Sequence, residues 1–218
     1  MAPAAAGVVT GSVHPRFKAS SDGGTRLACA DVTTEVSVSS TVTSNILQCI
    51  PYTASAWLRG VAANWSKWRW LSLKFIYIPT CPTSVSGSVH MGFLYDQSDS
   101  TPATVAEMAA LRGYTTGPVW SGSEAAVMLS DVSRACPPGA ICASLDVTKL
   151  SKPWYSYVTS TTLTTSITLD PSLGNIYVPA RLVILTADGS ATDAVSVGRL
   201  YVQYEVELIE RIVASDNL

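Results

Sequence analysis

The chain has 218 residues, enough for one large domain with a substantial hydrophobic core. Only 14% of the residues are charged and the formal net charge is −2, which excludes a free-standing nucleic-acid-binding protein that depends on a strong positive field. Hydrophobic residues make up 47% of the chain, yet every apolar run is interrupted well before the roughly 18 residues that a membrane-spanning helix needs. We therefore expect no membrane association, and burial of the apolar excess in a core or against other chains.

The first 25 residues are rich in Ala, Gly, Ser and Pro and show no alternation of apolar side chains. They predict a flexible arm over residues 1–25, followed by one folded domain over residues 26–218. Because no charge precedes Arg16 except the His14 side chain, and no continuous apolar stretch follows, we expect no secretory signal and synthesis in the cytoplasm. The cysteines are odd in number and contain no C-x-x-C pair, so reduced, buried thiols are expected at Cys29, Cys49, Cys81, Cys136 and Cys142.

The remaining sequence alternates with period two in several stretches, and β-branched residues are frequent, as is typical of strands. Strands are predicted over 32–38, 46–52, 71–77, 89–95, 176–186 and 197–209, with shorter apolar stretches at 125–129 and 141–145. Helices are predicted over 55–63 and over 101–111, the second with Thr101 as N-cap and Gly113 after its end. About eight strands with two helical insertions indicate an all-β protein, an eight-stranded antiparallel jelly-roll β-sandwich.

Two carboxylates, Asp96 and Asp99, lie between a predicted strand and the predicted helix. Spacing alone favours a structural explanation, in which Asp96 ends the strand and Asp99 caps the helix. The alternative is that both converge on a hard cation such as Ca²⁺. That ion takes six to eight oxygens, so other ligands would have to come from elsewhere, including another copy of the chain.

Basic residues from Arg59 to Lys74 are interleaved with four tryptophans. This pattern fits a surface that stacks bases beside phosphate contacts, but tryptophans at such density more often fill a core or an interface. Only two histidines occur, so a Ser-His-Asp or Cys-His catalytic centre would depend on His90. No Cys/His pair has zinc-ligand spacing and no glycine-rich phosphate loop precedes a helix, so an enzyme is not expected.

Several segments of the chain, in this order, carry a resemblance to a known family: Trp57-Leu58-Arg59-Gly60-Val61-Ala62-Ala63-Asn64-Trp65-Ser66-Lys67, Tyr77-Ile78-Pro79-Thr80-Cys81-Pro82-Thr83, Gly87-Ser88-Val89-His90-Met91-Gly92-Phe93, Tyr95-Asp96 with Asp99, Gly113-Tyr114 with Thr116-Gly117-Pro118-Val119-Trp120, Gly174-Asn175-Ile176 with Val178-Pro179-Ala180-Arg181-Leu182-Val183, and Gly198-Arg199-Leu200-Tyr201. On these segments the chain resembles the coat proteins of sobemoviruses of the southern bean mosaic type. The resemblance covers about residue 26 to Leu218.

This resemblance implies a non-enzymatic shell domain whose copies assemble into an icosahedral plant-virus capsid around single-stranded RNA. In the family the shell usually has T=3 quasi-symmetry. The implied location is the virion, assembled in the cytoplasm of the host plant cell. A β-sandwich carbohydrate-binding, lectin-like module with exposed tryptophans and a structural Ca²⁺ at Asp96 and Asp99 is the alternative.

The resemblance also implies Ca²⁺ between neighbouring subunits. The family's two aspartate ligands match Asp96 and Asp99, a backbone oxygen of the next subunit matches Tyr155, and the C-terminal contributors match Asn217 and Leu218. Carboxylates gathered from several subunits repel one another, and a bound Ca²⁺ offsets that repulsion.

The family's long basic arm has no full counterpart here, where Arg16, Lys18 and Arg26 are the only bases near the start. This favours a shortened form of a longer protein, and it leaves a particle smaller than the family's usual shell as an alternative. Residues that we expect to face RNA are Arg59, Lys67, Arg69, Arg16 and Lys18.

Overall fold

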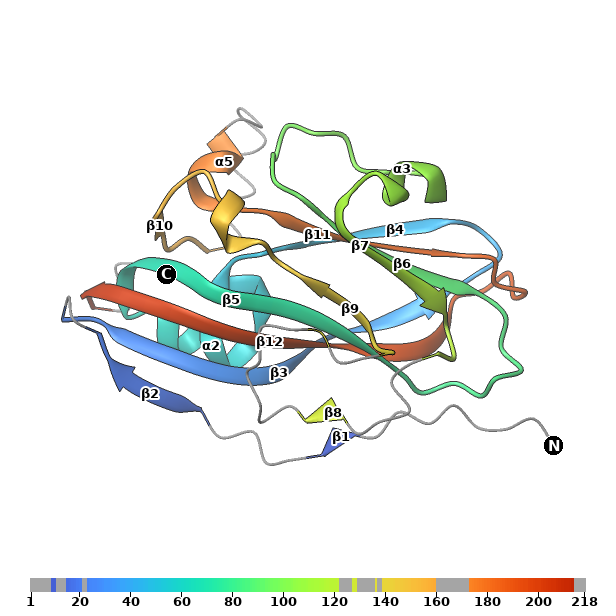
Figure 1. Ribbon diagram of the computed structural model, residues 1–218, viewed down its shortest axis with the longest axis horizontal. Helices are drawn as coiled ribbons and strands as arrows, with labels where there is room; N and C mark the ends of the chain where they lie inside the picture. Colours follow the sequence, from blue (N-terminus) through green and yellow to red (C-terminus); the bar gives the residue numbers. More distant parts are fainter. Residues whose placement is uncertain are drawn as a thin grey trace.

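The computed structural model describes residues 9–10, 15–20, 23–121, 127–128, 136, 139–159 and 173–213. Two large antiparallel sheets form two layers, as Figure 1 shows. The first sheet has the order β10-β5-β12-β3-β2, with β9 pairing with another part of β5. Its strands are β2 (Arg16–Ala19), β3 (Thr25–Val38), β5 (Trp65–Pro79), β9 (Ile141–Ser144), β10 (Tyr155–Ser156) and β12 (Val195–Arg211).

The second sheet has the order β4-β11-β6-β7 and lies over the first. Its strands are β4 (Thr43–Gln48), β6 (Ser88–Leu94), β7 (Arg112–Pro118) and β11 (Arg181–Ala187). A two-stranded parallel pair joins β1 (Val9–Thr10) to β8 (Val127–Met128). Short helical elements connect the strands: α1 (Pro51–Ala54), α2 (Ala56–Ala62), α3 (Val105–Ala109), the 3₁₀ turn η1 (Val147–Lys149) and α5 (Gly174–Tyr177). The jelly-roll β-sandwich expected from the sequence is confirmed.

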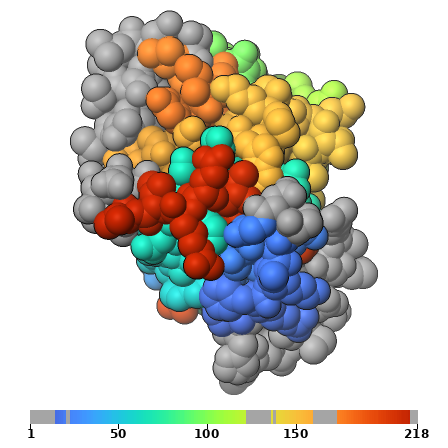
Figure 2. Space-filling view, turned by 90° about the vertical axis from the view of Figure 1, so that its left-hand side faces the viewer, coloured from blue at the N-terminus to red at the C-terminus, as the bar shows by residue number. Residues whose placement is uncertain are grey.

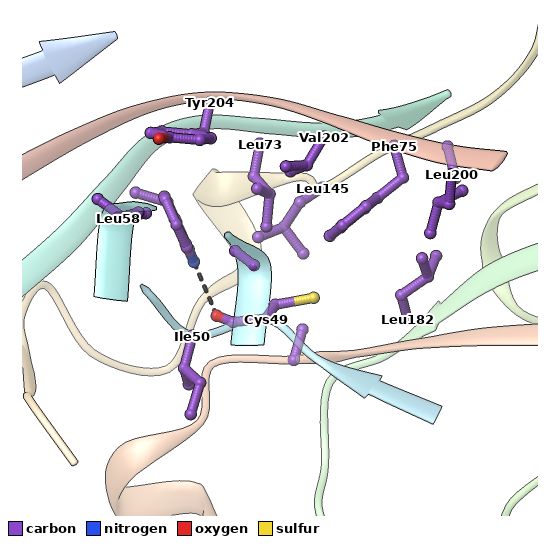
Figure 3. Close-up of a cluster of buried hydrophobic side chains, with 14 of the residues drawn as sticks. Cys49, Ile50, Leu58, Leu73, Phe75, Leu145, Leu182, Leu200, Val202 and Tyr204 are labelled. Atoms are coloured by element: carbon purple, nitrogen blue, oxygen red, sulfur yellow. Dashed lines mark hydrogen bonds between the residues drawn. The ribbon is translucent and has the colours of Figure 1, made fainter. Parts of the chain in front are cut away.

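The core lies between the two sheets and includes tryptophans of the aromatic cluster. Trp68 and Trp70 are almost fully buried, and Trp70 Nε1 donates a hydrogen bond to the backbone oxygen of Cys49 at 2.8 Å. Figure 3 shows this bond as the dashed line that ends on Cys49, among side chains from both sheets such as Phe75 and Leu182. Core packing is therefore the main role of these rings, as their density in the sequence favoured.

A β-bulge in β3 changes which of its side chains face the core. In β3 the core-facing positions shift from Leu27 and Cys29 to Val36 and Val38, because the register with β12 slips between Leu200 and Tyr201. Val32, which the sequence placed on the same face as the two later valines, is consequently 44% exposed. A bulge inserts one residue into a strand and so reverses the alternation beyond it, which a strict period-two pattern cannot show.

The second helix is shorter than predicted and starts later. Thr104, and not Thr101, is its N-cap: Thr104 Oγ1 accepts the amide of Glu107 at 3.3 Å, and the Glu107 carboxylate accepts the amide of Thr104 at 3.3 Å. This reciprocal capping box satisfies two backbone donors, whereas Thr101 offers no acidic partner three residues later. The predicted strand over 176–186 likewise begins only at Arg181, after α5.

Two of the five cysteines are not free thiols. Cys136 and Cys142 form a disulfide with their Cα atoms 5.8 Å apart, so the expectation of five reduced thiols was wrong for this pair. Their spacing of six residues did not reveal this pairing. Cys29, Cys49 and Cys81 are free and buried, and burial raises the pKa of the Cys49 thiol.

Residues 16–19, assigned from the sequence to the arm, form strand β2 and pair with the start of β3. This pairing extends the first sheet by one strand at its edge. No helix in the described part of the chain is long and apolar enough to cross a lipid bilayer.

Candidate metal site and basic surface

The loop that follows β6 carries the two carboxylates predicted to bind a cation. Asp96 Oδ1 accepts hydrogen bonds from the backbone amide of Ser98 at 2.8 Å and from Ser98 Oγ at 2.7 Å. An aspartate that bonds to the backbone two residues ahead closes a local turn, which explains why the chain reverses here. Asp99 is exposed, and its side chain makes no hydrogen bond or ion pair to any described residue. The expected capping role of Asp99 was wrong, because Thr104 caps the helix.

Two side chains from other elements hold this loop. Arg181, at the start of β11, is buried and donates from Nη2 to the backbone oxygens of Asp96 at 2.9 Å and Asp99 at 2.6 Å. Asn175, on α5, donates from Nδ2 to Asp96 Oδ1 at 2.7 Å and accepts the Gln97 amide at 2.8 Å. Sequence reasoning assigned a role to neither residue. A lone arginine at the start of the apolar run Arg181–Ala187 is the signal that could have singled out Arg181.

The electrostatics of the loop favour an ionised Asp96. The hydrogen bond from Asn175, with those from Ser98, lowers the pKa of Asp96 to about 2. Burial lowers the pKa of Arg181, which nevertheless stays far above neutrality for a guanidinium. The loop therefore presents one firmly held carboxylate and one unconstrained carboxylate three residues later.

The other predicted ligands are placed only in part. Tyr155 lies on β10, paired with Trp68, and β10 lies beside α5 (Figure 1). The Tyr155 side chain is buried, and its hydroxyl accepts the Lys152 amide at 3.3 Å, so only its backbone could serve as a metal ligand. Asn217 and Leu218 lie outside the described residues.

The described residues of one chain do not by themselves complete a Ca²⁺ site. Among the described residues there is no group of three or more His, Cys, Asp or Glu side chains that could hold a metal ion. Asp96 and Asp99 provide the hard, anionic oxygens that Ca²⁺ prefers, and the exposure of Asp99 leaves room for ligands from outside. The donor set thus fits Ca²⁺ as one half of a site that a neighbouring chain would complete.

Basic residues of β2, β3 and β5 lie close together in the strand registers at one end of the first sheet, where β12 runs between β3 and β5. Figure 2 looks onto that end, with the C-terminal part of the chain in red beside the N-terminal strands in blue. The strand registers place Lys18 beside Arg26 and Arg26 beside Glu207. Glu207 in turn lies beside Arg69. We call these four residues, which cross four strands, the Glu207 row. Three cations and one carboxylate make the row positive.

Glu207 organises this row. Its side chain is fully buried and accepts hydrogen bonds from Arg26 Nε at 3.1 Å, Arg69 Nε at 2.6 Å and the Ser20 hydroxyl. Burial by itself raises the pKa of Glu207, but the bonds from Ser20, Arg26 and Arg69 together outweigh it and leave the pKa lowered. The Arg69 guanidinium also lies over the Trp154 ring, 4.4 Å from its centroid.

The other residues expected to face RNA are held differently. Lys67 Nζ pairs with Glu210 at 2.6 Å on the exposed surface, which neutralises part of its charge. Arg59, on α2, donates from Nε to the backbone oxygen of Tyr52 at 3.0 Å and lies over the Tyr52 ring. Arg16 and Lys18 are exposed on the edge strand β2. The structure thus gathers Lys18 and Arg69 in one row and sets Arg59 apart from it on a helix.

His90 does not form a catalytic centre. Its Nε2 bonds Ser88 Oγ at 2.9 Å, but its Nδ1 faces the hydroxyls of Tyr114 at 2.9 Å and Thr116 at 2.8 Å. The carboxylate of Asp188 accepts the Ser88 hydroxyl at 3.0 Å and does not bond the histidine. A catalytic triad needs the carboxylate on the far side of the imidazole, where it orients the base. Burial also lowers the pKa of His90, consistent with a neutral, packed side chain.

Comparisons with known proteins identify the family to which the chain is similar. The model of the family "Viral coat protein (S domain)" matches residues 1–213. The capsid protein of Poinsettia latent virus is 42% identical over 169 residues, which are 77% of this chain and 55% of that protein, so the matched region spans about half of that relative. The capsid protein of tobacco necrosis virus (strain A) is 34% identical over 222 residues, covering 100% of this chain and 77% of that one. A solved tobacco necrosis virus structure superposes with a TM-score of 0.88 at 30% identity, covering 100% of this chain and 96% of the other.

Proposed function

On the premise that this chain belongs to the viral coat protein (S domain) family, we propose that its copies close into an icosahedral shell around single-stranded RNA, with Ca²⁺ bound between subunits. The coarser part of this statement is established by membership: the chain is a structural capsid protein of a plant virus, a component of the virion and not an enzyme. Membership in the family is the observation that supports assembly of the chain into a shell. The finer features, the sobemovirus type, the T=3 symmetry, the RNA and the Ca²⁺, are proposals.

The shell explains the apolar side chains that the chain leaves exposed. Phe17, Trp57, Ile46 and Val195 are each at least 38% exposed, although a soluble monomer would bury much of such surface. A coat subunit covers such residues with neighbouring copies. Electron microscopy of the purified protein should show closed particles, whereas a small soluble oligomer would contradict the closed shell. The diameter of the particles distinguishes a T=3 shell from a smaller one.

The Ca²⁺ proposal is supported by one observation: Asp96, whose pKa is lowered, lies in an exposed loop three residues before Asp99, whose carboxylate makes no hydrogen bond to the described residues. When bound, the ion would neutralise carboxylates that face one another across a subunit boundary. Asp96 and Asp99 would supply side-chain oxygens, the backbone of Tyr155 from a neighbouring chain a third ligand, and Asn217 and Leu218 the C-terminal ligands.

The test is the response of assembled particles to a chelator. Wild-type particles should swell in EDTA at neutral pH, because the carboxylates repel once the ion is removed. The double variant Asp96→Asn/Asp99→Asn should assemble and be indifferent to EDTA. Asp193→Asn, which removes an exposed carboxylate from another loop, is the matched control and should swell like the wild type. Chelator-induced swelling that persists unchanged in the double variant would remove these two ligands from the site.

The RNA proposal rests on the positive face of the first sheet. Lys67, Arg69, Arg16 and Lys18 share it, and a phosphate backbone is the polyanion that such a face attracts. Arg59 lies on α2 and is not part of the row. Affinity for a single-stranded oligonucleotide should fall steeply with salt, and Lys18→Ala should reduce the slope of that dependence by about 0.7, the value for one phosphate contact. An unchanged slope would exclude Lys18 as a contact.

A further inference from the structure

The 96–99 loop is held by side chains that come from distant parts of the sequence. Arg181 and Asn175 reach it from β11 and α5, about eighty positions further along the chain, and make four hydrogen bonds to it. Neither residue was predicted as a ligand. These bonds determine how the carboxylates of Asp96 and Asp99 are presented.

Asn175 contacts the loop through both ends of its amide. Its Oδ1 accepts the backbone amide of Gln97 and its Nδ2 donates to Asp96 Oδ1. The orientation of the amide is fixed by these partners, because a backbone N–H requires an acceptor and a carboxylate requires a donor. No other side chain of the same length combines the two functions: aspartate lacks the donor, and leucine lacks both.

The bonds to Asp96 determine which of its oxygens is available. Oδ1 already accepts three hydrogen bonds, two from Ser98 and one from Asn175, whereas Oδ2 accepts none from the described residues. A carboxylate oxygen offers about two lone-pair sites, so Oδ1 is saturated. Asp96 can therefore approach a cation only through Oδ2, as a monodentate ligand.

Arg181 fixes the backbone of the same loop. One nitrogen, Nη2, bonds the carbonyl oxygens of both Asp96 and Asp99, so those carbonyls point toward the guanidinium and away from any cation. The arginine is buried, and its stem is packed at the start of β11, opposite Leu94. The backbone at both aspartates is thereby tied to the start of β11.

We propose that Asn175 and Arg181 are positioning residues that hold Asp96 and Asp99 in the geometry for binding Ca²⁺ before the ion arrives. This inference rests on the metal site given under the proposed function. Residues behind the ligands orient them and raise affinity by removing the cost of ordering, and their loss typically weakens metal binding 10- to 100-fold.

The test compares assembled wild-type particles with three variants, Asn175→Ala, Asn175→Asp and Arg181→Lys. Ca²⁺ affinity is measured by calorimetry, and hydrogen exchange of the Gln97 amide is measured in EDTA. We expect Asn175→Ala to bind Ca²⁺ about 10- to 100-fold more weakly and to exchange the Gln97 amide faster even without metal. Arg181→Lys keeps the charge but loses the planar guanidinium, and should weaken binding too; it serves as the second variant if Asn175→Ala does not assemble.

Two comparisons separate positioning from other roles. Asn175→Asp should also bind more weakly, whereas tighter binding would identify residue 175 as a direct ligand and overturn the inference. The thermal midpoint in EDTA should change little in Asn175→Ala; a midpoint that falls in proportion to the loss of affinity would indicate a merely structural role and overturn it as well. Asn64→Ala removes an amide that bonds backbone oxygens near α2, and should leave Ca²⁺ affinity unchanged.

The result for the wild type distinguishes the two proposals. If wild-type particles bind Ca²⁺ and Asn175→Ala binds it equally well, the positioning inference is wrong while the metal site stands. If wild-type particles bind no Ca²⁺, the metal site is wrong and the inference falls with it.

Discussion

Glu207 provides the sharpest test of how the basic surface is built. Its carboxylate is fully buried and holds Arg26 and Arg69, whose side chains are 41% and 33% exposed. The change Glu207→Gln keeps the shape of the side chain but removes its charge, so two arginines then lie close together without a counter-charge. Arg69 keeps its contact with the Trp154 ring, so it does not simply move away.

The expected loss of stability follows from this geometry. Removing one partner of a fully buried ion pair costs about 3–5 kcal/mol. Because both arginines remain partly exposed and can regain water, we discount this to about 2–3 kcal/mol. A domain of this size loses about 2–4 °C in Tm for each kcal/mol, so Glu207→Gln should lower Tm by about 4–12 °C.

The matched control is three residues further along the same strand. Glu210 pairs with Lys67 at 2.6 Å, as close as the contacts of Glu207, but the two side chains are 50% and 44% exposed. Exposed pairs contribute less than about 1 kcal/mol, so Glu210→Gln should lower Tm by less than about 4 °C. Scanning calorimetry of wild type and both variants, at one concentration and one oligomeric state, measures the difference.

The pH dependence of Tm tests whether the charge of Glu207 is the cause of the stabilisation. The pKa of Glu207 is lower in the folded protein than in the unfolded chain, so its contribution is complete above the unfolded-state value of about 4.3 and is lost as the pH falls toward the folded-state pKa. The gap in Tm between wild type and Glu207→Gln should thus be constant near neutrality and close in acid. Equal effects of the two glutamine substitutions, or a gap that does not close in acid, would refute the reasoning.

Three further predictions concern packing, capping and the disulfide. Gly198→Ala should destabilise the protein by about 1–3 kcal/mol in urea unfolding, because a Cβ there would lie 2.4 Å from the Tyr77 ring. Gly60→Ala, on α2, should stabilise it by about 0.5–1 kcal/mol, because a Cβ there would meet no atom within 4 Å. The opposite order of stabilities would contradict the packing. Thr104→Ala should cost about 1 kcal/mol by calorimetry, and Thr101→Ala much less. Cys136→Ser should lower stability by about 2 kcal/mol in oxidising buffer and match the wild type in reductant, and a difference that survives reduction would speak against the disulfide as its cause.

Local patterns in the sequence were sufficient for the class of fold. Alternation in the stretch from Leu73 to Tyr77 predicted a strand, and the structure has that strand, with side chains on both of its faces buried. The helix near Trp57 was also predicted, because its signals lie within a few residues of one another. The pairing of Asp96 and Asp99 in one loop could be predicted because they lie three positions apart in the sequence.

Features that depend on bulges could not be predicted in the same way. Val32 was placed on the core face because its neighbours alternate with it, but the slip of register opposite Leu200 reverses the alternation. The position of a bulge is set by how two strands match, and the partner of Val32 lies about 170 residues away. Similarly, the disulfide requires the Cα atoms of Cys136 and Cys142 to lie 5.8 Å apart, a distance that a spacing of six residues does not specify.

The sequence by itself determined the strands, the buried tryptophans and the two neighbouring carboxylates, because each depends on interactions between residues close together along the chain. Only the tertiary structure decided that Asn175 and Arg181 hold the loop of those carboxylates, and that Glu207 joins arginines from two other strands. These contacts join residues about 80 to 180 positions apart. Their geometry is fixed by strand register and sheet order, which arise from the packing of the whole core and from no single segment.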